Sequence, residues 1–105
     1  MTELCNVTLT KAANIYFDGK VTSRKVTLAD GSIKTLGIMM PGEYTFAAGD
    51  EELMEILAGN VEVLLSGKKE WINISAGQRF AVAANTKFDI KVKTLTDYCC
   101  SYFPE

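Results

Sequence analysis

Glu52 is the residue of this chain whose type and surroundings best suit chemistry on a polar ligand. Its predicted strand places Glu52 on one face with Met54 and Ile56, because alternate residues of a strand point to the same side. A carboxylate that faces a small apolar interior is costly to desolvate unless a cation or a hydroxyl group contacts it. Candidate partners are Arg79, Lys91 and the hydroxyl groups of a bound ligand. The alternative is a solvated or salt-bridged carboxylate at the rim.

Several aromatic residues could form the walls of a binding site for a flat ligand. Tyr44, Phe46 and Phe88 would suit a base or a sugar ring if they lined the mouth of a small barrel, and Tyr98 is a further candidate. Aromatic side chains also pack the interiors of sheets by default. Most of the aromatic residues of the chain are therefore expected in the core.

The spacing from Glu52 to Gly59 resembles the end of the first metal-binding motif of the cupin fold, in which an apolar run and a turn glycine follow a carboxylate. In a metal-binding cupin the other ligands are histidines, but this chain has no histidine. Phe46, Ala48 and Phe88 stand near the positions where imidazoles would be expected. One carboxylate cannot hold zinc or iron alone, so we expect no metal cofactor.

Turn signals recur along the chain at intervals that suit short strands. They are Asp18-Gly19, Asp30-Gly31, Pro41-Gly42, Gly49-Asp50, Gly59-Asn60, Ser66-Gly67, Ala76-Gly77 and Asn85-Thr86. Evenly spaced turns of this kind are typical of β-sandwiches and barrels. We therefore predict an all-β fold, a single-domain cupin-like jelly-roll barrel or sandwich.

Apolar and polar residues alternate between these turns, as half-buried strands require. In the segment 87–93, "KFDIKVK", Phe88, Ile90 and Val92 share one face and the charged residues share the other. The segment 50–59, "DEELMEILAG", could also be read as a short helix. It is too short for a confident helix and a glycine ends it, so we predict a strand.

Length and charge exclude several classes of protein. A chain of 105 residues is long enough for one hydrophobic core and too short for two. We expect a main domain over residues 14–105, preceded by an arm or edge strand over residues 1–13. The net charge of −2 gives no electrostatic basis for nucleic-acid binding. No apolar run is long enough to span a membrane.

The N-terminal sequence and the cysteines indicate a cytoplasmic protein. The segment 1–17 lacks the basic and apolar regions of a signal peptide. The chain has three cysteines, of which Cys99 and Cys100 are adjacent, and neighbouring cysteines rarely form a bridge within one chain. We expect reduced thiols. Strand alternation then predicts that one of the adjacent pair faces the core and the other faces outward.

Taken together, the motifs resemble one family, the small cupin-fold pyrimidine/purine nucleoside phosphorylases. The matching residues are "YFDGKV" (16–21), Gly37, "GEYTF" (42–46), Glu52, Met54, Gly59, Trp71, Gly77, Phe80, Phe88 and "YCCSYF" (98–103). The resemblance covers residues 14–103, nearly the whole chain. Two departures stand out: Ala83-Ala84 replaces a Pro-Gly turn, and about ten residues precede Asn14 as an extension.

The resemblance implies phosphate-dependent cleavage of purine and pyrimidine nucleosides to free base and ribose 1-phosphate. It implies broad tolerance of the base, inorganic phosphate as co-substrate and no cofactor. It also implies a cytoplasmic homodimer. A different class of function stays open from the residues alone, namely a non-catalytic, metal-free cupin that binds a sugar or a nucleotide.

Phosphorolysis of an N-glycosidic bond depends on positioning and electrostatics, and the candidate residues can be given roles on that basis. We expect Glu52 to stabilise positive charge on the ribose, as carboxylates do in glycosidases. We expect Arg79 or Lys91 to bind phosphate. Tyr44, Phe46, Phe88 and Tyr98 would contact the nucleoside without reading the edges of the base.

Overall fold

The computed structural model describes residues 3–104, which form eleven strands and one short 3₁₀ turn. The strands are β1 (Thr8–Leu9), β2 (Asn14–Tyr16), β3 (Val21–Thr27), β4 (Ile33–Met39), β5 (Gly42–Ala48), β6 (Glu51–Ala58), β7 (Asn60–Leu64), β8 (Ile72–Ser75), β9 (Arg79–Val82), β10 (Thr86–Val92) and β11 (Thr96–Phe103). The 3₁₀ turn, η1 (Phe17–Gly19), connects β2 to β3.

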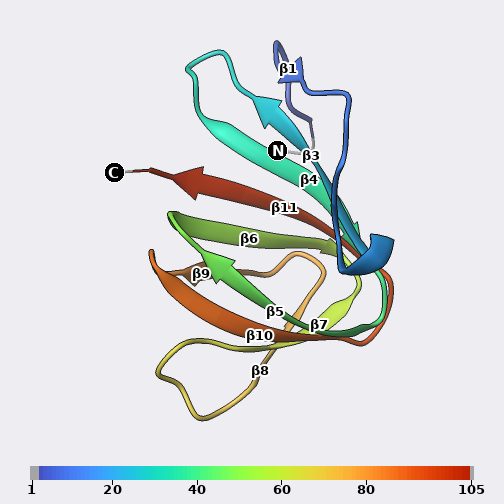
Figure 1. Ribbon diagram of the computed structural model, residues 1–105, viewed down its shortest axis with the longest axis vertical. Helices are drawn as coiled ribbons and strands as arrows, with labels where there is room; N and C mark the ends of the chain where they lie inside the picture. Colours follow the sequence, from blue (N-terminus) through green and yellow to red (C-terminus); the bar gives the residue numbers. More distant parts are fainter. Residues whose placement is uncertain (1–2, 105) are drawn as a thin grey trace.

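The strands form two antiparallel sheets that face each other (Figure 1). The larger sheet has the order β1-β3-β4-β11-β6-β9, and β2 pairs with β3 beside β1. The smaller sheet has the order β5-β10-β7-β8. Strands that are neighbours in space are often distant in sequence, as in β4-β11-β6, and this is the connectivity of a jelly roll. The prediction of an all-β, cupin-like jelly-roll sandwich is confirmed.

Turn chemistry and alternation explain why the chain folds into these strands. Every turn signal in the sequence falls between two strands, at the end of a strand or in η1. Phe88, Ile90 and Val92 of β10 are at most 4% exposed, whereas Lys87 on the other face is exposed. This alternation is expected for a sheet with one face against the core.

The segment 51–58 is a strand, as predicted, and carries Glu52, Met54 and Ile56 on its inner face. Met54 and Ile56 are 4% and 1% exposed, respectively. β6 pairs with β11 on one side and with β9 on the other. The backbone groups of this segment form hydrogen bonds to both neighbouring strands. The segment is therefore a strand and not the short helix that its sequence also allowed.

The core lies between the inner faces of the two sheets. The larger sheet contributes Val21, Met39, Met54, Ile56, Phe80, Val82, Tyr98 and Cys100, and the smaller sheet contributes Tyr44, Ala48, Val61, Val63, Ile74, Phe88, Ile90 and Val92. Side chains from both faces interdigitate in such sandwiches. No metal or disulfide is needed to account for a core of this size.

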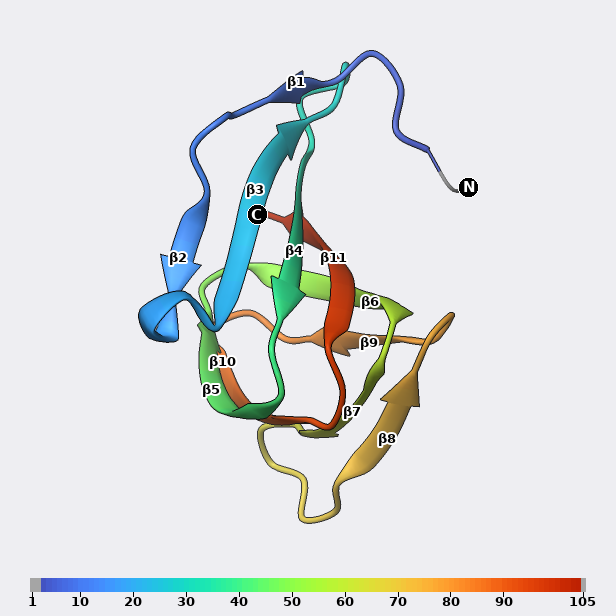
Figure 2. The ribbon, with the colours of Figure 1, turned by 90° about the vertical axis from the view of Figure 1, so that its right-hand side faces the viewer.

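The N-terminal part of the chain extends the larger sheet at its edge. β1 and β2 both pair with β3, one after the other along its length, and Figure 2 shows the two segments beside β3. The β3–β4 hairpin reaches beyond the smaller sheet in Figure 1. Its outer part therefore has an inner face that the smaller sheet does not cover.

Gly37 on β4 lets the ring of Tyr98 approach the backbone closely. A Cβ atom at position 37 would be 2.8 Å from the Tyr98 hydroxyl oxygen and would also overlap the carbonyl oxygen of Thr22. Tyr98 is the register partner of Gly37 on the adjacent strand β11, and its hydroxyl donates a hydrogen bond to that same Thr22 carbonyl, at 3.3 Å. Only glycine leaves room for this arrangement.

We expect Gly37→Ala to destabilise the protein by about 1–3 kcal/mol, the usual cost of overpacking, because the displaced oxygen belongs to the backbone. Urea denaturation measures the free energy of unfolding. Gly49→Ala is the matched control, since a Cβ at Gly49 has nothing within 4 Å. Equal stabilities of the two variants would contradict the close approach at Gly37.

Candidate active site

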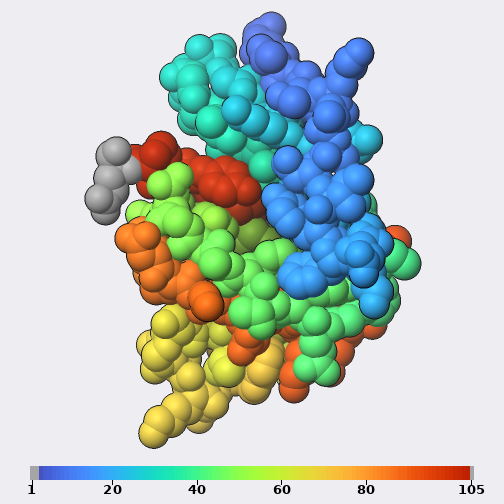
Figure 3. Space-filling model, in the orientation of Figure 1, coloured from blue at the N-terminus to red at the C-terminus, as the bar shows by residue number. Residues whose placement is uncertain are grey.

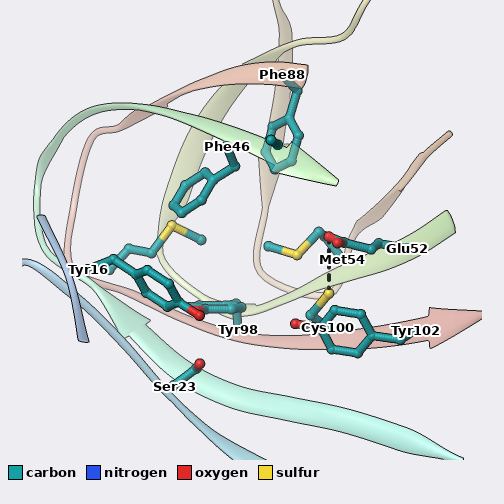
Figure 4. A pocket seen from close by; sticks show the side chains of 11 residues that line it. Tyr16, Ser23, Phe46, Glu52, Met54, Phe88, Tyr98, Cys100 and Tyr102 are labelled. Carbon is teal, nitrogen blue, oxygen red and sulfur yellow. Dashed lines mark hydrogen bonds between the residues drawn. The ribbon is translucent and has the colours of Figure 1, made fainter. Parts of the chain in front are cut away.

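A pocket of about 140 Å³ opens between the two sheets and brings the predicted carboxylate together with aromatic and hydroxyl groups. The residues that line it are Tyr16, Ser23, Met39, Phe46, Ala47, Glu52, Met54, Phe88, Tyr98, Cys100 and Tyr102. Figure 4 shows Glu52, Cys100 and Tyr102 on one side of the pocket and Phe46 on the other. All eleven of these residues lie on strands.

Phe46 and Phe88 form an aromatic wall, as predicted from the alternation of their strands. The two residues are register partners on β5 and β10, and their rings stack with centroids 5.6 Å apart. Such stacked pairs present a flat apolar surface. This surface suits one face of a sugar or base ring.

Tyr44 lies behind this wall and does not line the pocket. Its ring packs against Phe17, with centroids 4.9 Å apart, and its hydroxyl donates to the carbonyl oxygen of Met40 at 2.7 Å. Tyr44 and Phe46 share a face of β5 as predicted. Of the two, only Phe46 lines the pocket. The structure therefore does not bring Tyr44 into this pocket with Phe46 and Phe88.

Glu52 is partly buried in the pocket and is held by a thiol. The Cys100 Sγ donates a hydrogen bond to Glu52 Oε1 at 3.5 Å. Burial raises the pKa of the Glu52 carboxyl above its usual range; the thiol hydrogen bond opposes this shift, and the nearby carboxylate of Asp50 adds to it. The combination of a desolvated carboxylate with one weak donor leaves capacity to accept hydrogen bonds from a ligand.

Three further hydroxyl groups line the same pocket as the carboxylate. Tyr98 and Ser23 both line the pocket, and Tyr98 is thus placed where the sequence predicts a binding residue. Tyr102 lies beyond Cys100 on the same face of β11, and its hydroxyl is 3.1 Å from Thr35 Oγ1. Burial raises the pKa values of both tyrosines and of the Cys100 thiol, so all three are neutral hydrogen-bond donors near pH 7.

Arg79 lies on the opposite face of the larger sheet from Glu52. Its register partner across β6 and β9 is Glu55, which points outward, and Arg79 is exposed whereas Phe80 beside it is buried. The side chain borders a different hollow on the outer surface. The predicted contact between Arg79 and Glu52 is wrong, because Arg79 is one residue out of phase with the inner face.

Lys91 also points away from the pocket. Its Nζ lies 4.3 Å from the centroid of the Trp71 ring, while Ile90 and Val92 on either side are buried. A cation–π contact of this kind places the ammonium on the outer surface of the smaller sheet. The structure therefore contradicts the predicted role of Lys91 as a partner of Glu52.

Cys100 and Tyr102 are pocket residues that the sequence analysis did not single out. The signal was present, since both share the strand face of Tyr98 in the segment 96–103. Alternation does place Cys99 and Cys100 on opposite faces, as predicted, but both are buried, at 7% and 2% exposure. Cys99 is covered in a hollow of the outer face that Leu4, Leu57 and other residues line.

No group of three or more acidic, cysteine or histidine side chains within residues 3–104 could hold a metal ion. The same residues include no helix with the length and apolar character needed to cross a membrane.

Comparison with known proteins identifies relatives over almost the full chain. The family model described as "Pyrimidine/purine nucleoside phosphorylase" matches residues 11–102. A protein of that name from Colwellia psychrerythraea is 66% identical over 102 residues, which are 97% of this chain and 98% of the relative. One from Hydrogenovibrio crunogenus is 59% identical over the same coverage.

A solved structure has the same fold. The crystal structure of a protein of unknown function from Acinetobacter sp. ADP1 superposes with a TM-score of 0.93 at 35% sequence identity, covering 96% of this chain and 98% of that one. The sequence relatives match 102 of the 105 residues. These two relatives therefore share at least part of the segment before Asn14, whereas the family model begins at residue 11.

The pH dependence of the free energy of unfolding should report the burial of the Glu52 carboxylate. Because the pKa of the Glu52 carboxyl is raised in the folded state, its protonation stabilises the folded protein. This contribution to the free energy of unfolding is fully present below the pKa of the unfolded chain, near 4.5, and is lost as the pH rises through the folded-state pKa. Glu52→Gln cannot titrate. We expect its free energy of unfolding, relative to wild type, to increase as the pH rises from 4 to 8. Urea denaturation at each pH measures this difference, and a constant difference would show that the carboxylate is not desolvated.

Proposed function

Because the chain belongs to the pyrimidine/purine nucleoside phosphorylase family, we propose that it cleaves purine and pyrimidine nucleosides with inorganic phosphate. The products would be the free base and ribose 1-phosphate. The observation that supports this most directly is Glu52, a partly buried carboxylate that faces an aromatic wall and hydroxyl donors in one pocket.

Glu52 would act on the sugar. As the bond between C1′ and the base nitrogen breaks, its electron pair leaves with the base and positive charge develops on the ribose. A carboxylate that is already desolvated stabilises this charge without reorganising water, as carboxylates do in glycosidases. An oxygen of HPO₄²⁻ then bonds to C1′, and the proton that phosphate gives up balances the charge on the departing base nitrogen.

The walls of the pocket fit a broad range of bases. Phe46 and Phe88 offer ring faces and Met54 offers a flexible thioether; such groups pack against any flat base without reading its hydrogen-bonding edge. We propose broad base specificity on this ground. The proposed chemistry uses neither a metal nor a cofactor, since Glu52 and the hydroxyl donors supply its electrostatic part.

We also propose a cytoplasmic homodimer. All three cysteines are free, which suits a reducing compartment. On the outer face of the larger sheet, Leu36, Ile38 and Leu57 are 38%, 37% and 48% exposed. These apolar residues lie on β4 and β6, on either side of β11, and form a patch that a second copy of the chain could cover.

The reaction is tested by incubating purified protein with uridine, inosine and guanosine, with and without phosphate, and measuring free base. We expect release of base from all three nucleosides only when phosphate is present. Release without phosphate would indicate a hydrolase, and no release would favour a non-catalytic binding module.

In the same assay, Glu52→Gln should lower kcat/KM by roughly 10²–10³-fold, the usual effect of losing one electrostatic group, because the neutral amide cannot stabilise the ribose cation. The midpoint of thermal unfolding controls for folding and should not fall. Wild-type turnover by this variant would rule out the role given to Glu52.

The homodimer is tested by sedimentation equilibrium, with an expected mass twice that of one chain. The double variant Leu36→Lys, Ile38→Lys should sediment as a single chain with an unchanged circular dichroism spectrum, because two charges would be buried in the interface. A wild-type mass equal to one chain at micromolar concentration would rule out the dimer.

A further inference from the structure

A second hollow adjoins the pocket and is open to the surface. It has a volume of about 630 Å³ and includes Lys25, Thr35, Asp50 and Tyr102 among its lining residues. Tyr102 lines both this hollow and the pocket that contains Glu52. In Figure 3, atoms of the C-terminal strand (red) are exposed between those of the β3–β4 hairpin (cyan) and those of β6 (green).

Lys25 is a cation on the inner face of the larger sheet. Alternation along β3 places Lys25 on the same face as Val21 and Ser23, which are 0% and 5% exposed. Ser23 lines the pocket, and Lys25 lines the hollow next to it. Lys25 remains exposed because it lies on the part of the hairpin that the smaller sheet does not cover.

The ammonium group of Lys25 has no carboxylate partner in the described part of the chain. The ion pair between Lys93 and Glu62 is the only one within residues 3–104. A lysine that faces a hollow and forms no ion pair is available to bind an anion.

Neutral hydrogen-bonding groups line the hollow together with Lys25. Its register partner on β4 is Thr35, whose hydroxyl is 3.1 Å from the hydroxyl of Tyr102. The side-chain amide of Asn14 also borders the hollow and donates to Ser23 Oγ at 3.3 Å. One ammonium with hydroxyl and amide donors is a suitable set of groups for phosphate oxygens.

Three other cations of the described chain face away from the pocket and the hollow. Arg79 and Lys91 face outward, as described above, and Lys34 donates to Ser101 Oγ at 2.7 Å on the outer face. Among the residues that line the pocket and the adjoining hollow, Lys25 is the only cation.

We propose that the hollow is the phosphate subsite, in which Lys25 binds the inorganic phosphate and the hydroxyls of Thr35 and Tyr102 orient it. This inference rests on the proposed function and locates the phosphate-binding site of that reaction in the hollow. Phosphate at Lys25 would lie on the far side of Tyr102 from Glu52, next to a ribose in the pocket. Binding energy would then hold the two reactants side by side.

Two carboxylates moderate the affinity. Asp30 and Asp50 also line the hollow. Asp30 Oδ1 accepts hydrogen bonds from the backbone amide and the hydroxyl of Ser32, at 2.9 and 2.6 Å, and these donors partly neutralise it. Weak binding of phosphate suits a co-substrate that must exchange in every turnover. Removing one of these negative charges should strengthen phosphate binding, whereas removing the charge of Lys25 should weaken it.

The first experiment measures the KM for phosphate at saturating nucleoside. We expect Lys25→Met to raise it by about tenfold or more, as for the loss of a charged hydrogen bond, with the KM for nucleoside unchanged. Asp30→Asn should lower the KM for phosphate, because it removes a negative charge and keeps an oxygen acceptor for Ser32. Arg79→Met, which removes a cation from the outer face, should leave it unchanged.

A second experiment separates this inference from the proposed reaction. Titration of inorganic phosphate into the protein, followed by ³¹P NMR line broadening, measures binding without turnover. We expect broadening with wild type and Glu52→Gln, and much less with Lys25→Met. If wild type binds phosphate in this way but releases no base, the subsite stands and the proposed reaction fails.

The inference is overturned if Lys25→Met binds phosphate as wild type does, or if wild type binds none at tens of millimolar. It is also overturned if Arg79→Met, instead of Lys25→Met, raises the KM for phosphate. Circular dichroism of each variant controls for folding, and Lys25 is exposed, so its replacement should not unfold the chain.

Discussion

The pairing of β11 with β4 on one side and β6 on the other is the constraint on which the rest of the structure depends. This strand is the last in the chain, yet it lies in the middle of the larger sheet. Its inner face presents Tyr98, Cys100 and Tyr102 in a row. Because a shift of one residue would turn all three outward, the register of these two ladders fixes the floor of the pocket and the position of the thiol beside Glu52.

Glu52 shows how such a scaffold can hold a charge without a metal. Its carboxylate is too buried to be fully hydrated and has a thiol as its protein partner. Thiols are weak donors, so the desolvation cost is only partly offset within the protein. A ligand with hydroxyl groups can offset more of it. The surroundings of the carboxylate are apolar on one side and rich in hydroxyl groups on the other. They keep it poorly hydrated and able to interact with the ribose in the proposed reaction.

The sequence predicted much of the fold, and less of the site. Turn residues and alternation located the strands, including 51–58, because both signals are local. Strand phase also placed Glu52, Phe46 and Phe88 inward. The predicted pairing of Arg79 with Glu52 failed, because Phe80 and not Arg79 occupies the inner face of β9. Which residues of one face meet a ligand depends on how far the two sheets overlap, and this is a long-range property. Tyr44 faces inward and is covered by the packing of the two sheets. Lys25 also faces inward but stays exposed, because it lies beyond the edge of the smaller sheet.

The side chains that line the pocket project from β-strands and not from loops. Glu52, Cys100, Tyr102, Phe46 and Phe88 each belong to a hydrogen-bonded ladder, so their relative positions are as rigid as the sheets themselves. Loop exchange, the common route by which enzymes acquire new specificities, would leave this cavity almost unaltered. Divergence among such proteins has to proceed by replacing individual inward-facing side chains, one strand position at a time.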